Sequence, residues 1–496
     1  MTKNTSERCL LVGTPASVAL ARRQLDLLDC PPVVIGAVHV NPAEDEGCEP
    51  VVLNLGDEAE IAEICRAHAI DLAVVSLPGA LAGVESRVRQ RLGRAGVRVR
   101  VVPMLTELMA REPMLVRARL GQAIDLASLV SREPHRVERE QLSRLLRNAR
   151  VLITGAGGSI GSEIARLCAS FDLAQLVLVD RSENALFEID RSLGRGRAKV
   201  SRLAIMHDVV DEAATLRLVG ETRPDLIFHA AAHKHVPLME DHPAHALINN
   251  FFGTRSIADA AVAHGVERFV LISSDKAVNP SSVMGATKRL AEMYIQGLAH
   301  GGSMRTRLSM VRFGNVLGSA CSVLPIWESQ IAEGGPVTVT DERMTRYFMT
   351  IPEAAGLVVH AASLGRADEA EVFVLDMGKP IPIVDLAQRF IAAHGFRPVV
   401  QTDANSDRAW DEIAITFTGA RPGEKIHEEL SYHEEGLRRT SHTGIFALAD
   451  ARAPDPAMLA AMVEHLGRAR RSGDSREVVT AIARFIPHLT RTRAAA

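Results

Sequence analysis

The chain has 496 residues, of which 47% are hydrophobic, and its formal net charge at pH 7 is -3. A chain of this size and composition can bury a large core, which excludes an intrinsically disordered protein. The nearly balanced charge gives no electrostatic basis for binding nucleic acid, so we expect no nucleic-acid partner.

Six cysteines stand at positions 9, 30, 48, 65, 168 and 321, and none of them forms a Cys-x-x-Cys pair. Their spacing therefore predicts neither a zinc site nor a disulfide framework, and we expect reduced thiols and no bound metal. No uninterrupted apolar run approaches the ~20 residues that span a bilayer, and the N-terminal MTKNTSERCLLVG has no signal-type cleavage site. These features predict a soluble, cytoplasmic protein without a membrane span.

Residues 8 to about 130 alternate apolar runs with amphipathic stretches of helical pattern, such as ASVALARRQLDLL and EAEIAEICRAHA. Strand and helix in alternation predict a parallel sheet covered by helices, so we assign residues 1–130 to a Rossmann-like domain. The runs that we predict to be buried strands are CLLVG (9–13), VVIGAVHV (33–40), LAVVSLP (72–78) and VRVRVVP (97–103).

The turn after the first of these strands contains only one of the glycines of a phosphate-binding loop. Gly13 is followed by TPASVA, and Pro15 removes an amide donor from the place where a phosphate needs one. We therefore expect this turn to bind a dinucleotide poorly or not at all. A regulatory or structural role for the first domain is favoured over cofactor binding.

A polar stretch of helical pattern, SREPHRVEREQLSRLL (131–146), follows, and we assign residues 131–148 to a linker. From Arg150 the alternation restarts and is more complete, which predicts a second doubly wound parallel sheet within a domain of residues 149–450. The fold class is thus α/β with two Rossmann-like domains. The strands of the second sheet are predicted at VLITG, LVLVD, LAIMHDV, LIFHAAA, RFVLISSD and LSMVRFGNV.

From about Leu317 the pattern becomes less regular. The short strands VTVTD, VFVLDMG and AITFTGA mix with the helical stretches IPEAAGLVVHAAS and IVDLAQRFIAAH, which predicts a smaller, substrate-binding lobe. Residues 451–496 have a helical pattern with basic residues near the end, and we assign them to a C-terminal helical tail.

The second domain opens with a glycine-rich loop between a strand and a helix, VLITGAGGSIGSEIA. Gly155, Gly158 and Gly161 allow a tight turn and a close approach to a pyrophosphate, while Ser159 and Ile160 begin the helix whose free amides face it. A glycine pattern alone is weak and could be an ordinary turn, but a strand before it and a helix after it favour a dinucleotide site.

Further residues fit the same cofactor. Asp180 ends the next strand, about 20 residues on, where an acid holds the adenosine ribose. The cofactor is therefore expected to be NAD, although Arg181 could accept a 2′-phosphate, so NADP stays open. Asp208 is placed to touch the adenine, and the small side chains of Ala230, Ala231 and Ala232 would let the backbone pass close to the cofactor.

The stretch SSDKAVNPSSVMGATKR (273–289) has the shape of a Tyr-x-x-x-Lys element, but Met284 stands in the tyrosine position. A thioether can neither donate nor accept a proton in catalysis. Lys288 lies four residues later, on the same face of the predicted helix, where it can hold the nicotinamide ribose. If the site is catalytic, other residues must carry the protons.

Residues 150–450 resemble the bacterial capsule-type polysaccharide-biosynthesis proteins, which are nucleotide-sugar 4,6-dehydratases of the extended short-chain dehydrogenase/reductase group. The resemblance rests on the glycine loop, HKHVPLME, SSDK, MGATK, RFGNVLGS, MTRYFMTIPEA, VFVLDMGKPIPIVDLA and TGARPGEK. Longer members carry a nucleotide-binding-type domain before the dehydratase and usually begin with transmembrane helices, a feature that we do not carry over.

The resemblance implies a reaction on UDP-N-acetylglucosamine. Hydride leaves carbon 4 for NAD, the acidified proton on carbon 5 is removed, water leaves from carbon 6, and the hydride returns to carbon 6. The product is a 4-keto-6-deoxy sugar, made without net redox change. Elimination needs a base at carbon 5 and an acid for the leaving hydroxyl.

The resemblance assigns these roles to residues 274–276. Asp275 would protonate the leaving hydroxyl if a raised pKa keeps it protonated, and Lys276 would take the carbon 5 proton if burial lowers its pKa. Ser274 would hydrogen-bond the oxygen on carbon 4, whose proton goes to either Asp275 or Lys276. The family also has methionine at the position of Met284, so this residue is no sign of an inactive enzyme.

Other residues are expected around the substrate and the cofactor. Asn250 matches the asparagine that orients the backbone of such sites. Lys234 and His235, next to His233, are expected in a substrate-facing loop, a reading favoured over a metal site. Arginine suits a diphosphate because its fork binds two oxygens at once, although each of these residues could instead be structural. The candidates at the UDP end are Asn315, Ser319, Arg346, Arg421 and Glu424.

Two other functions remain open. A nucleotide-sugar epimerase has the same fold and cofactor, but it favours tyrosine at position 284 and needs no acid and base for water loss. A non-catalytic sensor of nucleotide sugars is the other, against which the intact glycine loop and Lys288 argue. We expect a UDP-sugar as ligand and a homo-oligomer as the assembly. The configuration of the product at carbon 5 does not follow from the sequence.

Overall fold

The computed structural model describes residues 7–26, 31–40, 53–77, 82–101, 129, 133–195, 200–299, 305–319, 322–366, 369–400, 412–432, 434–449 and 453–489. The chain divides into two compact units. The main segment of the first is Met1–Ile124, and the second comprises Asp125–Ala392, Arg397–Ala404 and Ile413–Ala496. Among the described residues, no helix is both long and apolar enough to cross a membrane.

The first unit holds a parallel sheet of four strands in the order β2-β1-β3-β4. Successive residues of β1 point to opposite faces of this sheet. Leu10 and Val12 pack in the hydrophobic core on one face, and Cys9 and Leu11 pack in the core on the other. The elements in chain order are β1 (Arg8–Gly13), α1 (Pro15–Leu25), β2 (Val33–His39), a 3-10 turn (Glu58–Glu60), α2 (Ile61–Ala67), β3 (Leu72–Ser76), α3 (Ala82–Arg94) and β4 (Arg98–Val101).

In this first sheet the strand order reverses between β1 and β3, where a doubly wound fold would place its ligand. The end of β3 lies close to the turn after β1. The Ser17 hydroxyl donates a hydrogen bond of 2.5 Å to the carbonyl of Ser76, and a Cβ added to Gly13 would lie 2.2 Å from the same oxygen. Gly13 thus packs closely against the end of β3, and the weak or absent dinucleotide binding of this turn stays a prediction.

The second unit contains a sheet of nine strands in the order β19-β20-β15-β10-β9-β8-β5-β6-β7. The strands from β15 to β7 are parallel, whereas β20 and β19 add an antiparallel edge. Its strands are β5 (Arg150–Thr154), β6 (Gln175–Asp180), β7 (Arg202–Met206), β8 (Leu226–His229), β9 (Arg268–Ile272), β10 (Arg307–Arg312), β15 (Glu371–Leu375), β19 (Leu437–Arg439) and β20 (Ile445–Leu448).

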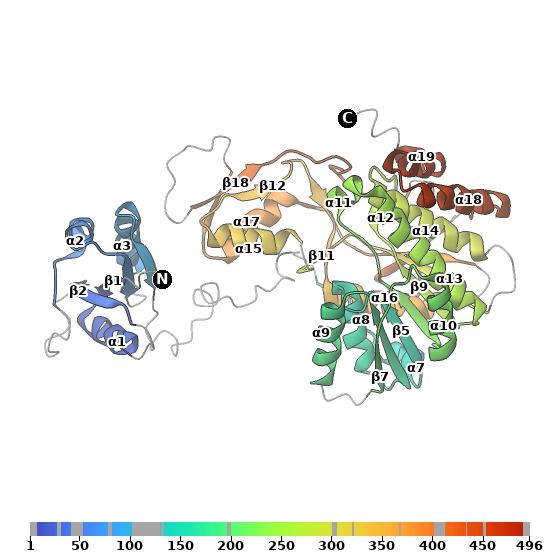
Figure 1. Cartoon of the computed structure of the whole chain (residues 1–496), viewed down its shortest axis with the longest axis horizontal. Coiled ribbons are helices and arrows are strands. Elements are labelled where there is room, and N and C mark those ends of the chain that lie inside the picture. The colour runs from blue at the N-terminus through green and yellow to red at the C-terminus, as the bar shows by residue number, and fades with distance from the viewer. Residues whose placement is uncertain are drawn as a thin grey trace. The chain divides into compact units, whose positions relative to one another are not determined.

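Helices cover both faces of this sheet (Figure 1), which explains why its central strands are apolar without alternation. Val151 and Ile153 of β5 pack on one face, and Leu152 packs on the other. The first face bears α7 (Arg139–Leu146), α8 (Ser159–Ala169), α9 (Glu183–Gly194) and α16 (Ile351–Leu364). The second bears α10 (Glu212–Thr222), a π-helix (Leu247–Phe252), α13 (Gly253–Ala263), α14 (Val283–Ala299), α18 (Pro456–Ser472) and α19 (Ser475–Phe485).

A smaller lobe carries a three-stranded sheet in the order β12-β18-β17, with α15 next to β12. The unit's other elements include those of this lobe. They are α11 (Val236–Asp241), α12 (Pro243–Ala246), a 3-10 turn (Asp275–Ala277), β11 (Asn315–Leu317), α15 (Val323–Ala332), β12 (Val337–Val339), β13 (Thr345–Arg346), β14 (Phe348–Thr350), β16 (Ile381–Pro382), α17 (Ile383–Ala393), β17 (Arg397–Val400) and β18 (Glu412–Phe417).

Several details differ from the sequence analysis. VFVLDMG, predicted for the smaller lobe, forms β15 and pairs with β10 in the main sheet. LSMVRFGNV, predicted as one strand, divides into β10 and β11. VRVRVVP was predicted to be buried, but β4 is an edge strand and only partly covered. The last residues of that stretch, and the end of the predicted tail after residue 489, lie outside the described residues.

Candidate active site

The glycine loop lies at the point where the order of the main sheet reverses, between β5 and β8. Ligands of doubly wound sheets bind at such points, because the connections leave in opposite directions and open a crevice. Gly155 has a φ of +65°, and a Cβ added there would lie 2.7 Å from the amide nitrogen of Ala231. A Cβ on Gly161 would lie 2.1 Å from the carbonyl oxygen of Gly155. The loop can therefore keep this shape only with glycine at both positions.

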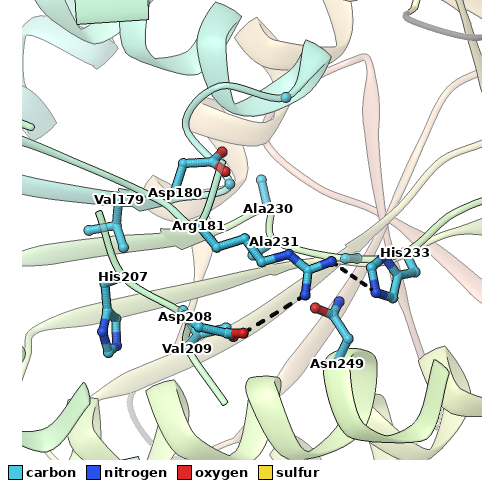
Figure 2. A pocket seen from close by; sticks show the side chains of 13 residues that line it. Val179, Asp180, Arg181, His207, Asp208, Val209, Ala230, Ala231, His233 and Asn249 are labelled. Carbon is cyan, nitrogen blue, oxygen red and sulfur yellow. Dashed lines mark hydrogen bonds and ion pairs between the residues drawn. The ribbon is translucent and has the colours of Figure 1, made fainter. Parts of the chain in front are cut away.

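Gly155 and Gly158 of this loop line a pocket (Figure 2). It contains most of the residues that the sequence predicted to touch the cofactor, drawn from the ends of β5, β6 and β8 and from the segment after β7. Its lining residues are Gly155, Gly158, Val179, Asp180, Arg181, His207, Asp208, Val209, Ala230, Ala231, Ala232, His233 and Asn249.

Three other predicted residues lie in the first turn of α8. Ser159 borders a neighbouring hollow together with Gly157 and Gly158, while Ile160 packs against the core of the sheet and Gly161 is buried. The pyrophosphate of a dinucleotide requires a narrow glycine turn and a helix N-terminus, with small side chains facing them. The residues present therefore fit such a cofactor.

Asp180 and Arg181 bring charge to the part of the pocket where the sequence predicts the adenosine. The Asp180 carboxylate accepts hydrogen bonds of 2.9 Å from the amides of Gly157 and Ser182, which fixes it beside the glycine loop. The Arg181 side chain reaches across the pocket, 3.1 Å from Nε2 of His233 and 3.9 Å from the carboxylate of Asp208 (Figure 2). The acid suits a ribose hydroxyl and the guanidinium suits a phosphate, so this pocket fits either dinucleotide.

Asn250 supports the pocket from behind without lining it. It lies buried in the π-helix, a type of distortion that often marks functional sites. Its Oδ1 accepts a bond of 2.8 Å from the amide of His233, and its Nδ2 donates to the carbonyl of His233 and to Oγ1 of Thr287, both at 3.1 Å. These bonds hold the chain after β8 against α14. Asn249, which the sequence analysis did not select, is the neighbour that faces the pocket.

We expect Gly161→Ala to weaken cofactor binding without unfolding the domain. The new methyl group forces the loop away from its present shape, and restoring that shape costs about 1–3 kcal/mol. The Kd for NAD should therefore rise roughly five- to hundredfold, measured by titration of the apoprotein.

Gly467→Ala in α18 is the matched control, because an added Cβ there meets only the end of the Arg471 side chain at 3.7 Å. Equal NAD affinity of wild type and Gly161→Ala would contradict the assignment of the loop.

The predicted proton-carrying residues follow β9, at the same edge of the sheet. Asp275 is fully buried, and its Oδ1 accepts hydrogen bonds from the Ser274 hydroxyl at 2.8 Å and from Nζ of Lys276 at 3.0 Å. Lys276 also donates to Oδ1 of Asn315 at 3.2 Å, so β11 contributes to the cluster. Oδ2 of Asp275 is buried and has no hydrogen-bond partner among the described residues. This oxygen is the acceptor that the cluster leaves open.

The expected pKa of Lys276 was wrong. Burial does act to lower this pKa, as predicted, but the carboxylates of Asp275 and Glu428 outweigh burial, and the pKa is raised above its ordinary value. Lys276 is therefore an ammonium ion in the resting site. It can act as a base only after it has given up a proton.

Met284 and Lys288 both lie buried on α14. Nζ of Lys288 donates a hydrogen bond of 2.7 Å to the carbonyl of Ile272, the last residue of β9, which places the amine beside the proton-carrying cluster. Burial lowers the pKa of Lys288 to about 8, with Glu292 acting in the opposite direction. Lys288 thus still carries a charge at neutral pH, as a residue that binds a ribose and steadies a sugar oxygen should.

The predicted substrate residues divide into two groups. Nζ of Lys234 donates to the Ser319 hydroxyl at 3.4 Å, Asn315 accepts a bond from Lys276, and His235 is the residue before α11. Arg346, by contrast, is buried and donates to the carbonyls of Thr345, Ile426 and Lys425. Its fork holds the backbone together, which is the structural alternative that the sequence left open.

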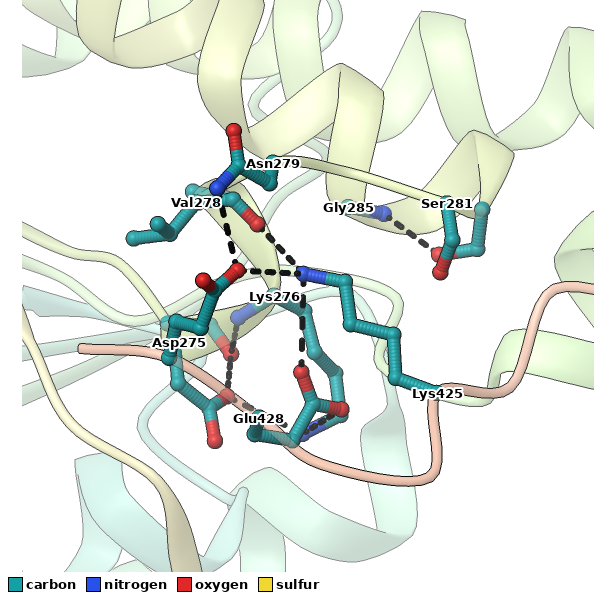
Figure 3. Close-up of polar contacts among 12 residues, drawn as sticks. Asp275, Lys276, Val278, Asn279, Ser281, Gly285, Lys425 and Glu428 are labelled. Carbon is teal, nitrogen blue, oxygen red and sulfur yellow. Dashed lines mark hydrogen bonds and ion pairs between the residues drawn. The ribbon is translucent and has the colours of Figure 1, made fainter. Parts of the chain in front are cut away.

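Arg421 and Glu424 form a turn, in which the Arg421 amide donates to Glu424 at 3.2 Å. Two later residues of the same segment, Lys425 and Glu428, enter the cluster around Lys276 (Figure 3), and the sequence analysis missed them. A compositional signal was present for Lys425. The chain has seven lysines among 57 basic residues, and two of them, Lys276 and Lys425, face Glu428 at 3.6 and 4.0 Å.

The family model described as "Polysaccharide biosynthesis protein" matches residues 151–450. Over 447 residues the chain is 39% identical to the probable polysaccharide biosynthesis protein EpsC of Bacillus subtilis, covering 88% of this chain and 71% of that protein. It is 41% identical over 372 residues to the capsular polysaccharide biosynthesis protein CapD of Staphylococcus aureus, covering 75% of this chain and 59% of CapD.

Among solved structures, Pen from Bacillus thuringiensis is similar with a TM-score of 0.54 and 31% identity, covering 63% of this chain and 90% of Pen. Two further relatives carry the names of different enzymes. A protein from Campylobacter jejuni named UDP-N-acetylglucosamine 4,6-dehydratase (inverting) is 28% identical to this chain. The match covers 56% of this chain and 76% of the Campylobacter protein. One from Rickettsia canadensis named UDP-glucose 4-epimerase is 30% identical, covering 58% and 78%.

Proposed function

The chain belongs to the polysaccharide biosynthesis protein family, and we propose that within it the protein is a UDP-N-acetylglucosamine 4,6-dehydratase. The observation that carries this proposal is the cluster after β9. Lys276 donates a hydrogen bond of 3.0 Å to the buried Asp275. An epimerase of this fold favours a tyrosine at position 284, and this chain has Met284 there. A buried acid and a lysine amine are the two groups that removal of water requires.

Asp275 transfers the protons of the sugar hydroxyls on carbons 4 and 6. Its open Oδ2 takes the proton from the hydroxyl on carbon 4 and later gives it to the hydroxyl that leaves carbon 6, so that one group serves as base and then as acid. Ser274 donates to Oδ1 at 2.8 Å and orients the carboxyl. Gly314 makes the space for Oδ2, because a Cβ there would lie 3.1 Å from it.

Lys276 handles the proton on carbon 5, which it removes and returns. Lys288 keeps a positive charge near the oxygen on carbon 4 and thereby favours its negatively charged form. The pocket of Figure 2, with the glycine loop and Asp180, would hold a nicotinamide dinucleotide, which would supply the hydride acceptor for carbon 4 and the hydride donor for carbon 6. The products are water and a UDP-4-keto-6-deoxy-N-acetylhexosamine, made as an intermediate for a surface polysaccharide or glycan.

The alternative is an epimerase, which the Rickettsia relative's name keeps open. Incubating the protein and NAD with UDP-N-acetylglucosamine, and following the sugar by NMR, separates the candidates. A dehydratase yields the methyl signal of a 6-deoxy sugar. An epimerase yields an intact 6-hydroxymethyl sugar inverted at carbon 4, and a non-catalytic sensor leaves the substrate unchanged. Either of the last two outcomes would contradict the proposal.

A further inference from the structure

Lys276 lies between two buried carboxylates, and only one of them belongs to its own motif. The second is Glu428, whose side chain is 3% exposed and whose Oε1 is 3.6 Å from Nζ of Lys276 (Figure 3). Glu428 comes from the segment after β18, far along the chain from residues 274–276. Its other oxygen, Oε2, is also buried and has no hydrogen-bond partner among the described residues.

Two cations besides Lys276 face this carboxylate. Nε of Arg346 lies 3.9 Å from Oε1, and Nζ of Lys425 lies 4.0 Å from Oε2. Both are already engaged: Arg346 donates to backbone carbonyls, and Lys425 donates to the carbonyl of Val278 at 2.7 Å. Glu428 therefore makes no short bond to either of them. A buried carboxylate without a full set of donors is costly, so packing alone does not account for Glu428.

We propose that Glu428 is a positioning residue that acts through Lys276: it holds the ammonium group beside Asp275 and takes a proton from it, which frees the amine for carbon 5. This inference rests on the proposed function. A small movement of the flexible lysine side chain closes the gap between Nζ and Oε1.

The protons balance over one turnover. Glu428 takes a proton from the Lys276 ammonium, leaving a carboxylic acid and an amine. The amine takes the carbon 5 proton as the enolate forms, and water leaves carbon 6 with the proton held by Asp275. When hydride reaches carbon 6, the ammonium returns its proton to carbon 5, and Glu428 gives its proton back to Lys276. No external acid, base or oxidant is consumed.

The proposal is tested with Glu428→Gln, which keeps the shape and removes the charge. The matched control is Glu429→Gln, because Glu429 is the adjacent residue and also contacts Lys425, at 3.7 Å, but its side chain is 51% exposed and directed at Asn279. Glu428→Asp is the second variant, which keeps the charge at a shorter reach. All are made in the full chain with NAD bound.

The first readout is the pKa of Lys276 itself, which needs no turnover. With only seven lysines, protein labelled with carbon-13 at lysine Cε gives few signals, and that of Lys276 is identified by its loss in Lys276→Arg. Among the described residues that raise the pKa of Lys276, removing Glu428 leaves Asp275, while Arg346 continues to lower this pKa. The titration midpoint should fall by about one to three pH units in Glu428→Gln and stay in place in Glu429→Gln.

The second readout is the pH dependence of kcat. In Glu428→Gln the proton of Lys276 must leave to water, so kcat at pH 7 should fall by about a hundredfold and recover as pH rises through the new midpoint of Lys276. The kcat of wild type and of Glu429→Gln should vary little over the same pH range. Glu428→Asp should retain part of the wild-type kcat at pH 7.

Two results would overturn the proposal: an unchanged Lys276 midpoint in Glu428→Gln, or a loss of kcat that is the same at every pH, as a merely structural residue would give. If wild type does not convert UDP-N-acetylglucosamine, the proposed function fails. The NMR midpoint still decides in that case whether Glu428 sets the charge of Lys276.

Discussion

Lys276→Ala is expected to lower kcat on UDP-N-acetylglucosamine by about a hundredfold to ten-thousandfold, the usual range for loss of a general base. The substitution removes the one amine that donates to both Asp275 and Asn315, and it leaves the pocket of Figure 2 intact. NAD affinity should therefore stay near that of wild type. Initial rates at saturating substrate, together with an NAD titration, measure both effects.

Lys379→Ala serves as the control, since Lys379 is exposed and lies outside the cluster. Activity of Lys276→Ala within a few-fold of wild type would remove Lys276 from the mechanism. Loss of NAD binding together with activity would show that the lysine supports the fold of the pocket and would leave no case for a role at carbon 5.

A second large effect is expected on stability, from Arg312→Leu. Arg312 is fully buried on β10 and binds two carboxylates. It donates at 2.8 Å to both oxygens of Glu292 on α14, and at 2.8 Å and 3.3 Å to Glu435, which precedes β19. Burial alone would raise the pKa of Glu292, but the bonds to Arg312 outweigh it and lower this pKa to about 2. Without the guanidinium, two buried carboxylates lose their main partner.

Removing one partner of a buried ion pair typically costs about 3–5 kcal/mol, so the free energy of unfolding of the second unit should fall by that amount. Urea unfolding followed by circular dichroism measures it. Arg343→Leu is the matched control, because Arg343 makes a similar two-point pair with Asp341 but is 69% exposed, and little change is expected there. A loss in Arg312→Leu no larger than in this control would contradict the account.

Local patterns predicted most of the second sheet. β5 and β6 are continuous apolar runs because both faces of the sheet are covered, and the strand, glycine loop and helix at residues 150–169 follow one another directly in the sequence. Partner choice between distant strands has no such signal. VFVLDMG was assigned to the smaller lobe because nothing within it indicates that β15 pairs with β10, which lies far earlier in the chain.

In the candidate site too, contacts between residues far apart in the chain could not be predicted. The motif around Asp275 and Lys276 could be found from the sequence, but the charge state of Lys276 could not. Burial was foreseeable, whereas the second carboxylate comes from Glu428, which only the folded chain brings within 3.6 Å. Arg346 is a similar case. A conspicuous arginine suggested a diphosphate ligand, and nothing in the sequence indicated that its fork also donates to the carbonyls of residues 345, 425 and 426.

The central claim is that hydride moves within one sugar molecule, from carbon 4 to carbon 6, while Asp275 and Lys276 move the protons. The most direct test uses UDP-N-acetylglucosamine that carries deuterium on carbon 4, with product analysis by NMR. We expect the deuterium in the new methyl group at carbon 6, with no net reduction of NAD, and this transfer should be lost in Lys276→Ala. Deuterium that is found again on carbon 4 of a sugar that keeps its hydroxyl on carbon 6 would contradict the account and identify an epimerase.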